Sequence, residues 1–267
     1  NHYPVVSTMR WMALILTMAV MAVGVQADIA ENPTRISDAQ LFAALDLDRP
    51  GLEEVAAAVE EEDYERAAAQ WAQYFRNRST PTMHFDRSRW ADYVRQRFPQ
   101  LQEVMVREAD DIAAGNISHG TISLPVSAKE IDWFHNPKKD TNYVSIVGSQ
   151  WFWQPVGRAY LLTSDEKYVE AFEWIFNSWY ENREAISEWQ GDLGFEPIWR
   201  AYYPGVQTRV LSDTYYCLGT SENLPPQTHL RVLKQILGAC SWLYAQEASY
   251  RKGNQQVAAV VGPGVAG

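Results

Sequence analysis

Apolar residues recur at steps of three and four along most of this 267-residue chain, and this spacing constrains its fold more than any other feature. Side chains spaced in this way share one face of an α-helix, which the helix buries against its neighbours. The segment after Asp63, for example, places Tyr64, Ala67, Trp71 and Phe75 on one such face. The pattern predicts an all-α protein. Helices are expected at about 37–45, 52–59, 63–75, 149–162, 166–182, 206–218 and 226–249, with a further helix ending near Gly115.

Helix boundaries and loops can also be placed from the sequence. Ser37 and Gln40 form a capping-box pattern, Asp63 is a favoured N-cap, and Gly115 suits a helix C-terminus. The irregular stretch 115–143 predicts a long loop with a short strand at Thr121–Val126, and a second loop rich in Trp, Gly and Pro is expected at 188–204.

The order of these segments indicates repeated helical hairpins. Hairpins packed around an axis form an α/α toroid, and hairpins packed along an axis form a solenoid. The sequence contains no fixed-period repeat, which disfavours a solenoid of regular repeats. We expect an incomplete α/α toroid in which the loops meet at one rim.

The N-terminal residues have the pattern of a targeting segment. Met9–Ala27 contains Arg10, an uncharged apolar run and small residues before Asp28, as in a secretory signal peptide. The alternative is an N-terminal membrane anchor. We expect residues 1–8 to be an upstream remnant, residues 28–267 to form one domain, and the protein to be periplasmic or secreted without a stable membrane anchor.

Charge and composition exclude several classes of function. The net charge of −10 argues against a nucleic-acid partner. Two cysteines, Cys217 and Cys240, exclude a disulfide scaffold and a four-thiolate zinc site, and they are either paired or buried as thiols.

Standard catalytic motifs are missing from the sequence. It has no Gly-rich phosphate loop, no G-x-S-x-G and no H-E-x-x-H, and its histidines are not at metal-ligand spacing. We therefore expect no metal and no cofactor. His119 and His135 lie in the long irregular loop, where a functional role is favoured, whereas His229 at a helix start is structural or exposed.

Two features are consistent with carbohydrate chemistry. Eleven Trp and fourteen Tyr provide rings for stacking on sugars or for a helical core. Glu188, Asp192 and Glu196 could supply a glycosidase acid and base, or they are ordinary loop charges.

Asn254 follows a Gly break and begins a new helix, so it is either a helix N-cap or an amide directed into a cleft.

The order of several short motifs resembles the N-terminal region of bacterial heparinase II/III-type polysaccharide lyases. The likeness covers nearly the whole chain after residue 28, and six motifs in the same order are more specific than any one of them. The resemblance implies an α/α toroid followed by a β-sandwich domain, and nothing in this chain resembles the second domain. The matching segments are Gly51–Val55 with Ala67–Arg78, Ala109–Gly115, Ile131–Pro137, Phe152–Tyr168, Trp199–Arg209 and Gly253–Gln256.

The same resemblance implies an acidic polysaccharide substrate and a β-elimination at a 4-linked uronic acid. In such a reaction a neutralised carboxylate stabilises the charge that forms when the C5 proton is removed. The resemblance assigns the neutralising role to Asn254 and leaves the base unassigned. Candidate substrate contacts are Arg209, Trp199, Tyr202, Tyr203, His135 and Gln255.

Four basic residues near this region, Arg200, Arg209, Arg251 and Lys252, could form a rim for an anionic chain. Arg209 could equally form a structural salt bridge. The alternative functions are a glycoside hydrolase on a similar toroid and a non-catalytic carbohydrate-binding domain. We expect the chain to lack part of a lyase active site and to be a partial or inactive fragment when alone.

Overall fold

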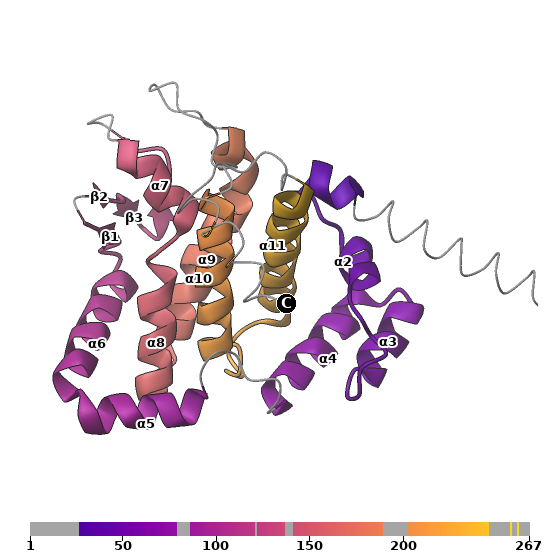
Figure 1. The fold of residues 1–267 in the computed structure, drawn as a ribbon, viewed down its shortest axis with the longest axis horizontal. Coiled ribbons are helices and arrows are strands. Elements are labelled where there is room, and N and C mark those ends of the chain that lie inside the picture. The colour runs from indigo at the N-terminus through magenta and orange to yellow at the C-terminus, as the bar shows by residue number, and fades with distance from the viewer. Residues whose placement is uncertain are drawn as a thin grey trace, which may run out of the picture.

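The computed structural model describes residues 27–78, 86–120, 122–136, 141–188 and 202–245, together with Val257 and Val261. Helices dominate these residues (Figure 1). None of the helices in the described ranges is both long enough and apolar enough to cross a membrane. After a helical segment at 27–31, the helices are α2 (Asp38–Ala44), α3 (Glu53–Glu60), α4 (Tyr64–Asn77), α5 (Arg87–Arg97), α6 (Pro99–Ala113), α7 (Thr141–Ser149), α8 (Trp153–Thr163), α9 (Lys167–Glu188), α10 (Tyr202–Leu218) and α11 (Pro226–Ala245).

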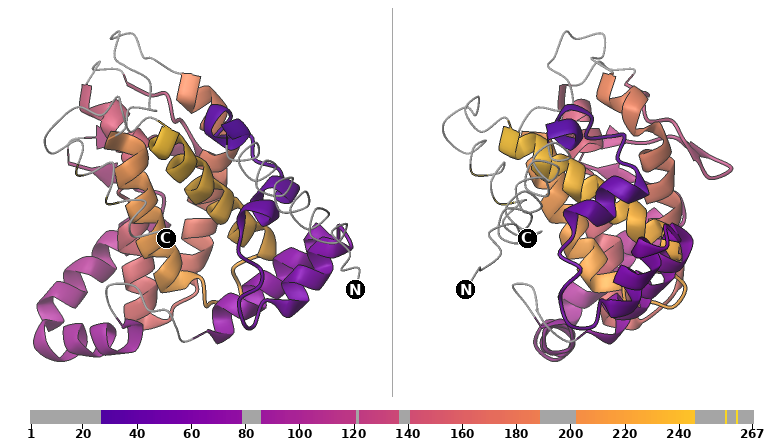
Figure 2. Two further views of the ribbon diagram at one scale, coloured as in Figure 1. Left: turned by 45° about the vertical axis from the view of Figure 1, so that its right-hand side comes forward. Right: turned by 90° about the vertical axis from the view of Figure 1, so that its right-hand side faces the viewer.

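The helices lie side by side in an open arc, in an order that differs from their order in the chain (Figures 1 and 2). Helix α6 packs against α8, α8 against α10, α10 against α11, and α11 against α4, which pairs with α3. Helix α9 packs on α8 and α6. Paired helices arranged in a partial ring are the predicted architecture, an incomplete α/α toroid.

The largest apolar core surrounds α8. Trp153 is fully buried and makes edge-to-face contacts with Phe172, Phe176 and Trp179 of α9, at ring-centroid distances of 6.3, 5.5 and 5.6 Å. Such contacts add specific geometry to the burial of large apolar surfaces. On α8, Gly157 lets α10 approach closely, because a Cβ at this position would lie 3.0 Å from the Cα of Thr214.

A second core holds α2, α3 and α4 against α11. The two cores meet at a buried polar contact between α4, α10 and α11. The indole Nε1 of Trp71 donates to the hydroxyl of Tyr215 at 3.3 Å, and that hydroxyl lies 2.6 Å from Nδ1 of His229. Burial is the largest cause that lowers the pKa of His229, to about 4. His229 is therefore neutral at physiological pH. Of the two roles that the sequence left open, structural or exposed, its burial supports the structural one.

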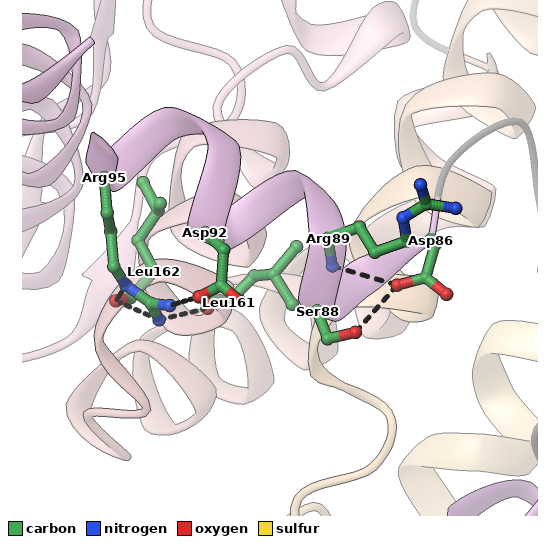
Figure 3. A network of polar contacts seen from close by, with 7 residues as sticks. All are labelled: Asp86, Ser88, Arg89, Asp92, Arg95, Leu161 and Leu162. Carbon is green, nitrogen blue, oxygen red and sulfur yellow. Dashed lines mark hydrogen bonds and ion pairs between the residues drawn. The ribbon is translucent and has the colours of Figure 1, made fainter. Parts of the chain in front are cut away.

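Polar contacts cap the start of α5 and join its other end to the last turn of α8 (Figure 3). A carboxylate oxygen of Asp86 accepts the backbone N–H of Arg89 at 2.9 Å and the hydroxyl of Ser88 at 2.8 Å. At the other end of α5, the guanidinium of Arg95 donates two hydrogen bonds to the carbonyl of Leu162, at 2.8 and 3.1 Å. Carbonyls in the last turn of a helix have no partner within the helix, so Arg95 satisfies a group that would otherwise need water.

Two short antiparallel hairpins occupy the irregular stretch after α6. Strands β1 (Ser118–His119) and β2 (Ile122–Ser123) pair His119 with Ile122, and β3 (Val126–Ser127) and β4 (Glu130–Ile131) pair Val126 with Ile131. Buried side chains attach this stretch to the helices. Trp133, for example, is fully buried and donates from Nε1 to Ser178 of α9 at 3.1 Å.

Most of the predicted helices are confirmed, together with the capping box at Ser37, the cap at Asp63 and the glycine just after the end of α6, Gly115, which has φ +89°. The predicted loop at 188–204 was wrong at its C-terminal end, because α10 begins at Tyr202, and the helix predicted to end near 182 was too short, because α9 extends to Glu188. Helices α5 and α7 were not predicted. Both cysteines are free thiols, and burial raises the pKa of each to about 12.

Candidate functional site

The residues predicted for the site divide into two groups. Arg209, Tyr203 and His135 are described by the structure, and Tyr202 is described as the first residue of α10 but without its side chain. The remaining candidates lie outside the described residues, so their roles stay predictions. They are Asn254, Gln255, Trp199, Arg200, Arg251, Lys252, Asp192 and Glu196, together with the side chain of Glu188.

Arg209 is held in place on α10 by an aromatic ring and a carboxylate. Its guanidinium carbon lies 5.2 Å from the ring centre of Trp151, and its Nη1 lies 4.0 Å from a carboxylate oxygen of Asp213, one turn further along α10. The amide of Gln154 donates to the same oxygen of Asp213 at 3.2 Å. The side chain of Arg209 is 30% exposed and that of Asp213 is 10% exposed. Arg209 is thus both positioned by the protein and accessible to an anion.

Trp151 links Arg209 of α10 to His119 of strand β1. It lies in the turn between α7 and α8, and its ring stacks on His119 of β1 with a centroid distance of 6.1 Å and an angle of 10° between the planes. Trp151 is half-buried and His119 is exposed. The cluster of His119, Trp151 and Arg209 therefore combines an exposed imidazole, an indole and a guanidinium, groups that suit a sugar ring with an acidic substituent.

Buried amides hold the elements that carry this cluster. Gln207 of α10 donates to the carbonyl of Gly148 in the last turn of α7 at 3.0 Å, and its own carbonyl accepts the amide of Gln235 of α11 at 2.8 Å. Gln207 and Gln235 are both only 3% exposed. Hydrogen bonds in a buried setting are costly to break, so this network fixes α10 relative to the turn that carries Trp151.

The other two described candidates have different surroundings. Tyr203 is half-buried and packs against the core around α8, in the first turn of α10. His135 is exposed, and its Nδ1 lies 3.7 Å from a carboxylate oxygen of Asp132. Their contact with substrate stays a prediction.

Sequence reasoning did not assign Trp151 to the site. The sequence placed it inside a predicted helix, whereas the structure has a break at Gln150, which adopts φ +54°. This left-handed residue separates α7 from α8 and leaves Trp151 in a turn, where its ring reaches β1 and α10.

Among the described residues, no group of three or more His, Cys, Asp or Glu side chains could hold a metal ion.

A protein-family model described as the heparinase II/III N-terminus matches residues 41–267. The chain belongs to this family. As a member of the heparinase II/III N-terminus family, it is 28% identical over 170 residues to a heparin-sulfate lyase of Bacteroides thetaiotaomicron, an alignment that covers 57% of this chain and 22% of that protein.

Solved structures similar to this heparinase II/III N-terminal chain have the same fold. A heparan sulfate lyase HepC from Pedobacter heparinus matches with a TM-score of 0.62 at 19% identity over 83% of this chain and 34% of that chain. A structure of heparinase III matches with a TM-score of 0.64 at 20% identity over 84% and 34%. A heparinase III described as the BT4657 gene product matches with a TM-score of 0.58 at 21% identity over 85% and 36%.

These comparisons confirm the predicted family and fold class. The heparinase II/III N-terminus match begins at residue 41 and includes all three residues of the Arg209 cluster. The chain spans about a fifth of the length of the curated relative and about a third of the length of the solved structures.

Proposed function

We propose that this chain forms the toroidal part of a polysaccharide lyase that cleaves a uronic-acid-containing chain by β-elimination. The match to the heparinase II/III N-terminus over residues 41–267 carries the proposal. A heparin-like or heparan-sulfate-like substrate is favoured over an alginate-like one, because the relatives are described as heparin-sulfate and heparan sulfate lyases.

Arg209 has the properties needed to bind an acidic group of the sugar. A guanidinium presents a planar set of donors that matches a carboxylate or a sulfate, and its charge is permanent. Trp151 and Asp213 restrict its orientation while leaving part of the group exposed. A sugar ring at this position can also contact the indole of Trp151 and the imidazole of His119.

The chemistry itself is assigned by the resemblance of the motif at 253–256. An uncharged amide at Asn254 would donate a hydrogen bond to the uronate carboxylate and so stabilise the enolate-like charge as the C5 proton leaves. A base takes that proton, and an acid protonates the oxygen of the leaving sugar. The base and the acid remain unassigned in this chain.

We also propose that the protein is exported to the periplasm or secreted. The support is the sequence of Met9–Ala27, with its single positive charge, apolar run and small residues before Asp28. An acidic extracellular polysaccharide is accessible to an exported enzyme. N-terminal sequencing of the protein recovered from culture tests this, since cleavage before Asp28 is expected.

The decisive experiment follows the double bond that elimination creates. Purified protein, both as this chain and as the longest product of its gene, is incubated with heparan sulfate and separately with alginate. A rise in ultraviolet absorbance with heparan sulfate supports the proposal, and a rise with alginate alone corrects the substrate. New reducing ends without absorbance would instead indicate a hydrolase, and binding without either product would indicate a carbohydrate-binding domain.

A further inference from the structure

A cavity of about 660 Å³ opens between α6, the turn joining β3 and β4, and α9. It shares no residue with the cluster of His119, Trp151 and Arg209. Its volume lies within the range of small-molecule sites in proteins. Its lining combines small apolar side chains, such as Ala113, Val126 and Ala171, with polar, charged and aromatic ones.

Trp174 lines this cavity in a fixed position. The ring is half-buried on α9, and its Nε1 donates a hydrogen bond to the backbone carbonyl of Lys129 in the β3–β4 turn. The bond joins two of the elements that form the cavity and restrains the edge of the indole. A restrained indole is a suitable stacking surface for the C–H face of a sugar.

The charged groups of the lining balance each other. Lys167 and Asp110 form an ion pair at 2.8 Å, and the hydroxyl of Tyr168 donates to the same oxygen of Asp110 at 2.7 Å. The remaining charged residues of the lining, Glu170 and Lys129, are exposed and opposite in sign. The lining thus has formal net charge zero and offers no net attraction to a polyanion.

Hydrogen-bond donors and acceptors line the cavity together with the ring of Trp174. The Glu170 carboxylate accepts, the Lys129 ammonium donates, and the exposed amide of Asn116 does both. Glu170 lies one helical turn before Trp174, so the two share a face of α9. Sugar hydroxyl groups both donate and accept, and an aromatic ring beside mixed hydrogen-bonding groups matches them.

We propose that this cavity is a second saccharide site, which binds a neutral sugar unit. It shares no residue with the cluster of His119, Trp151 and Arg209, in which the guanidinium of Arg209 is 30% exposed beside Asp213. Such a site would hold a neutral part of a polysaccharide while an acidic part lies elsewhere on the molecule.

Ligand-detected NMR titration of the full chain tests the proposal without any measurement of lyase activity. The probes are N-acetylglucosamine and methyl β-glucopyranoside as neutral sugars and glucuronate as an acidic one. The variant is Glu170→Ala, and the matched control is Glu103→Ala, which removes an exposed carboxylate from α6 outside the cavity lining. Asn116→Ala is a second variant, also at an exposed position.

At least one neutral sugar should bind saturably and more tightly than glucuronate. Loss of a hydrogen bond to a charged group should weaken binding by about tenfold in Glu170→Ala, and Asn116→Ala should weaken it by about fivefold. Glu103→Ala should leave it unchanged. Three results overturn the proposal: no binding of either neutral sugar up to about 50 mM, equal affinity in Glu170→Ala and the unaltered protein, or tighter binding of glucuronate. None of these results depends on whether the protein is a lyase.

Discussion

His229 is fully buried where the two cores meet, and its Nδ1 lies 2.6 Å from the Tyr215 hydroxyl. Its pKa is lowered from 6.5 to about 4, mainly by burial and also by the charge of Arg76. The folded protein therefore keeps this ring neutral at a pH at which the unfolded chain protonates it. Because the unfolded state binds more protons, the free energy of unfolding falls as the pH drops from about 6.5 to about 4. The full difference corresponds to about 3 kcal/mol, of which about 2 kcal/mol is lost by pH 5.

Urea unfolding at pH 7 and pH 5 measures this effect, with His229→Asn as the comparison. Asparagine retains a polar group near the position of Nδ1 but does not titrate in this range. The unaltered protein should lose about 2 kcal/mol more than the variant between the two pH values. Comparing the two changes cancels the contribution of groups common to both proteins. Equal losses in the two proteins would show that His229 does not control the acid sensitivity and would refute the argument.

Four further outcomes are expected. Arg209→Ala should weaken binding of a heparan sulfate oligosaccharide by about tenfold in calorimetry, because a charged donor is lost; unchanged affinity would remove Arg209 from the site. Arg95→Ala should lower the free energy of unfolding by about 1–2 kcal/mol in urea, since it leaves a carbonyl at the end of α8 without its partner. Gly157→Ala should lower it by about 1–3 kcal/mol, because the new methyl group meets the backbone of Thr214; no loss would contradict the close packing of α8 and α10. Asn254→Ala should abolish the ultraviolet absorbance change in the active form while circular dichroism stays constant, and retained turnover would contradict its assignment.

The sequence predicted the helices whose apolar faces are regular. Helix α4 is such a case, since Ala67, Trp71 and Phe75 are buried at helical spacing and Asp63 caps the first turn. Helix α5 was missed because it is mostly polar and buries only Ala91 and Val94, with Trp90 partly buried beside them, so its apolar stripe is short. A polar helix of this kind is held by tertiary contacts such as those of Arg95, which no local pattern reveals.

The start of α10 was missed for a different reason. Pro204 and Gly205 indicate a loop by composition, so the predicted loop ran to Pro204 and the predicted helix began only at 206. The structure places both in the first turn of the helix. A proline is tolerated there because the first N–H groups of a helix have no partner within it.

The cluster at the site could be predicted only in part. Arg209 was identified from its motif, whereas its partners come from distant parts of the chain. Trp151 reaches it because Gln150 adopts a left-handed conformation, and His119 reaches Trp151 from a hairpin that precedes α7. Contacts between residues so far apart in sequence depend on the packing of the helices and have no local signal.

The support that Trp151 and Asp213 give to Arg209 has a consequence for how tightly an anion can bind. A long cationic side chain normally loses much of its rotational freedom when it grips a ligand, and this entropy loss reduces affinity. Here the folded protein has already restricted the guanidinium before any ligand arrives. A lysine at the same position would keep the charge, but it would have to be ordered by the ligand itself.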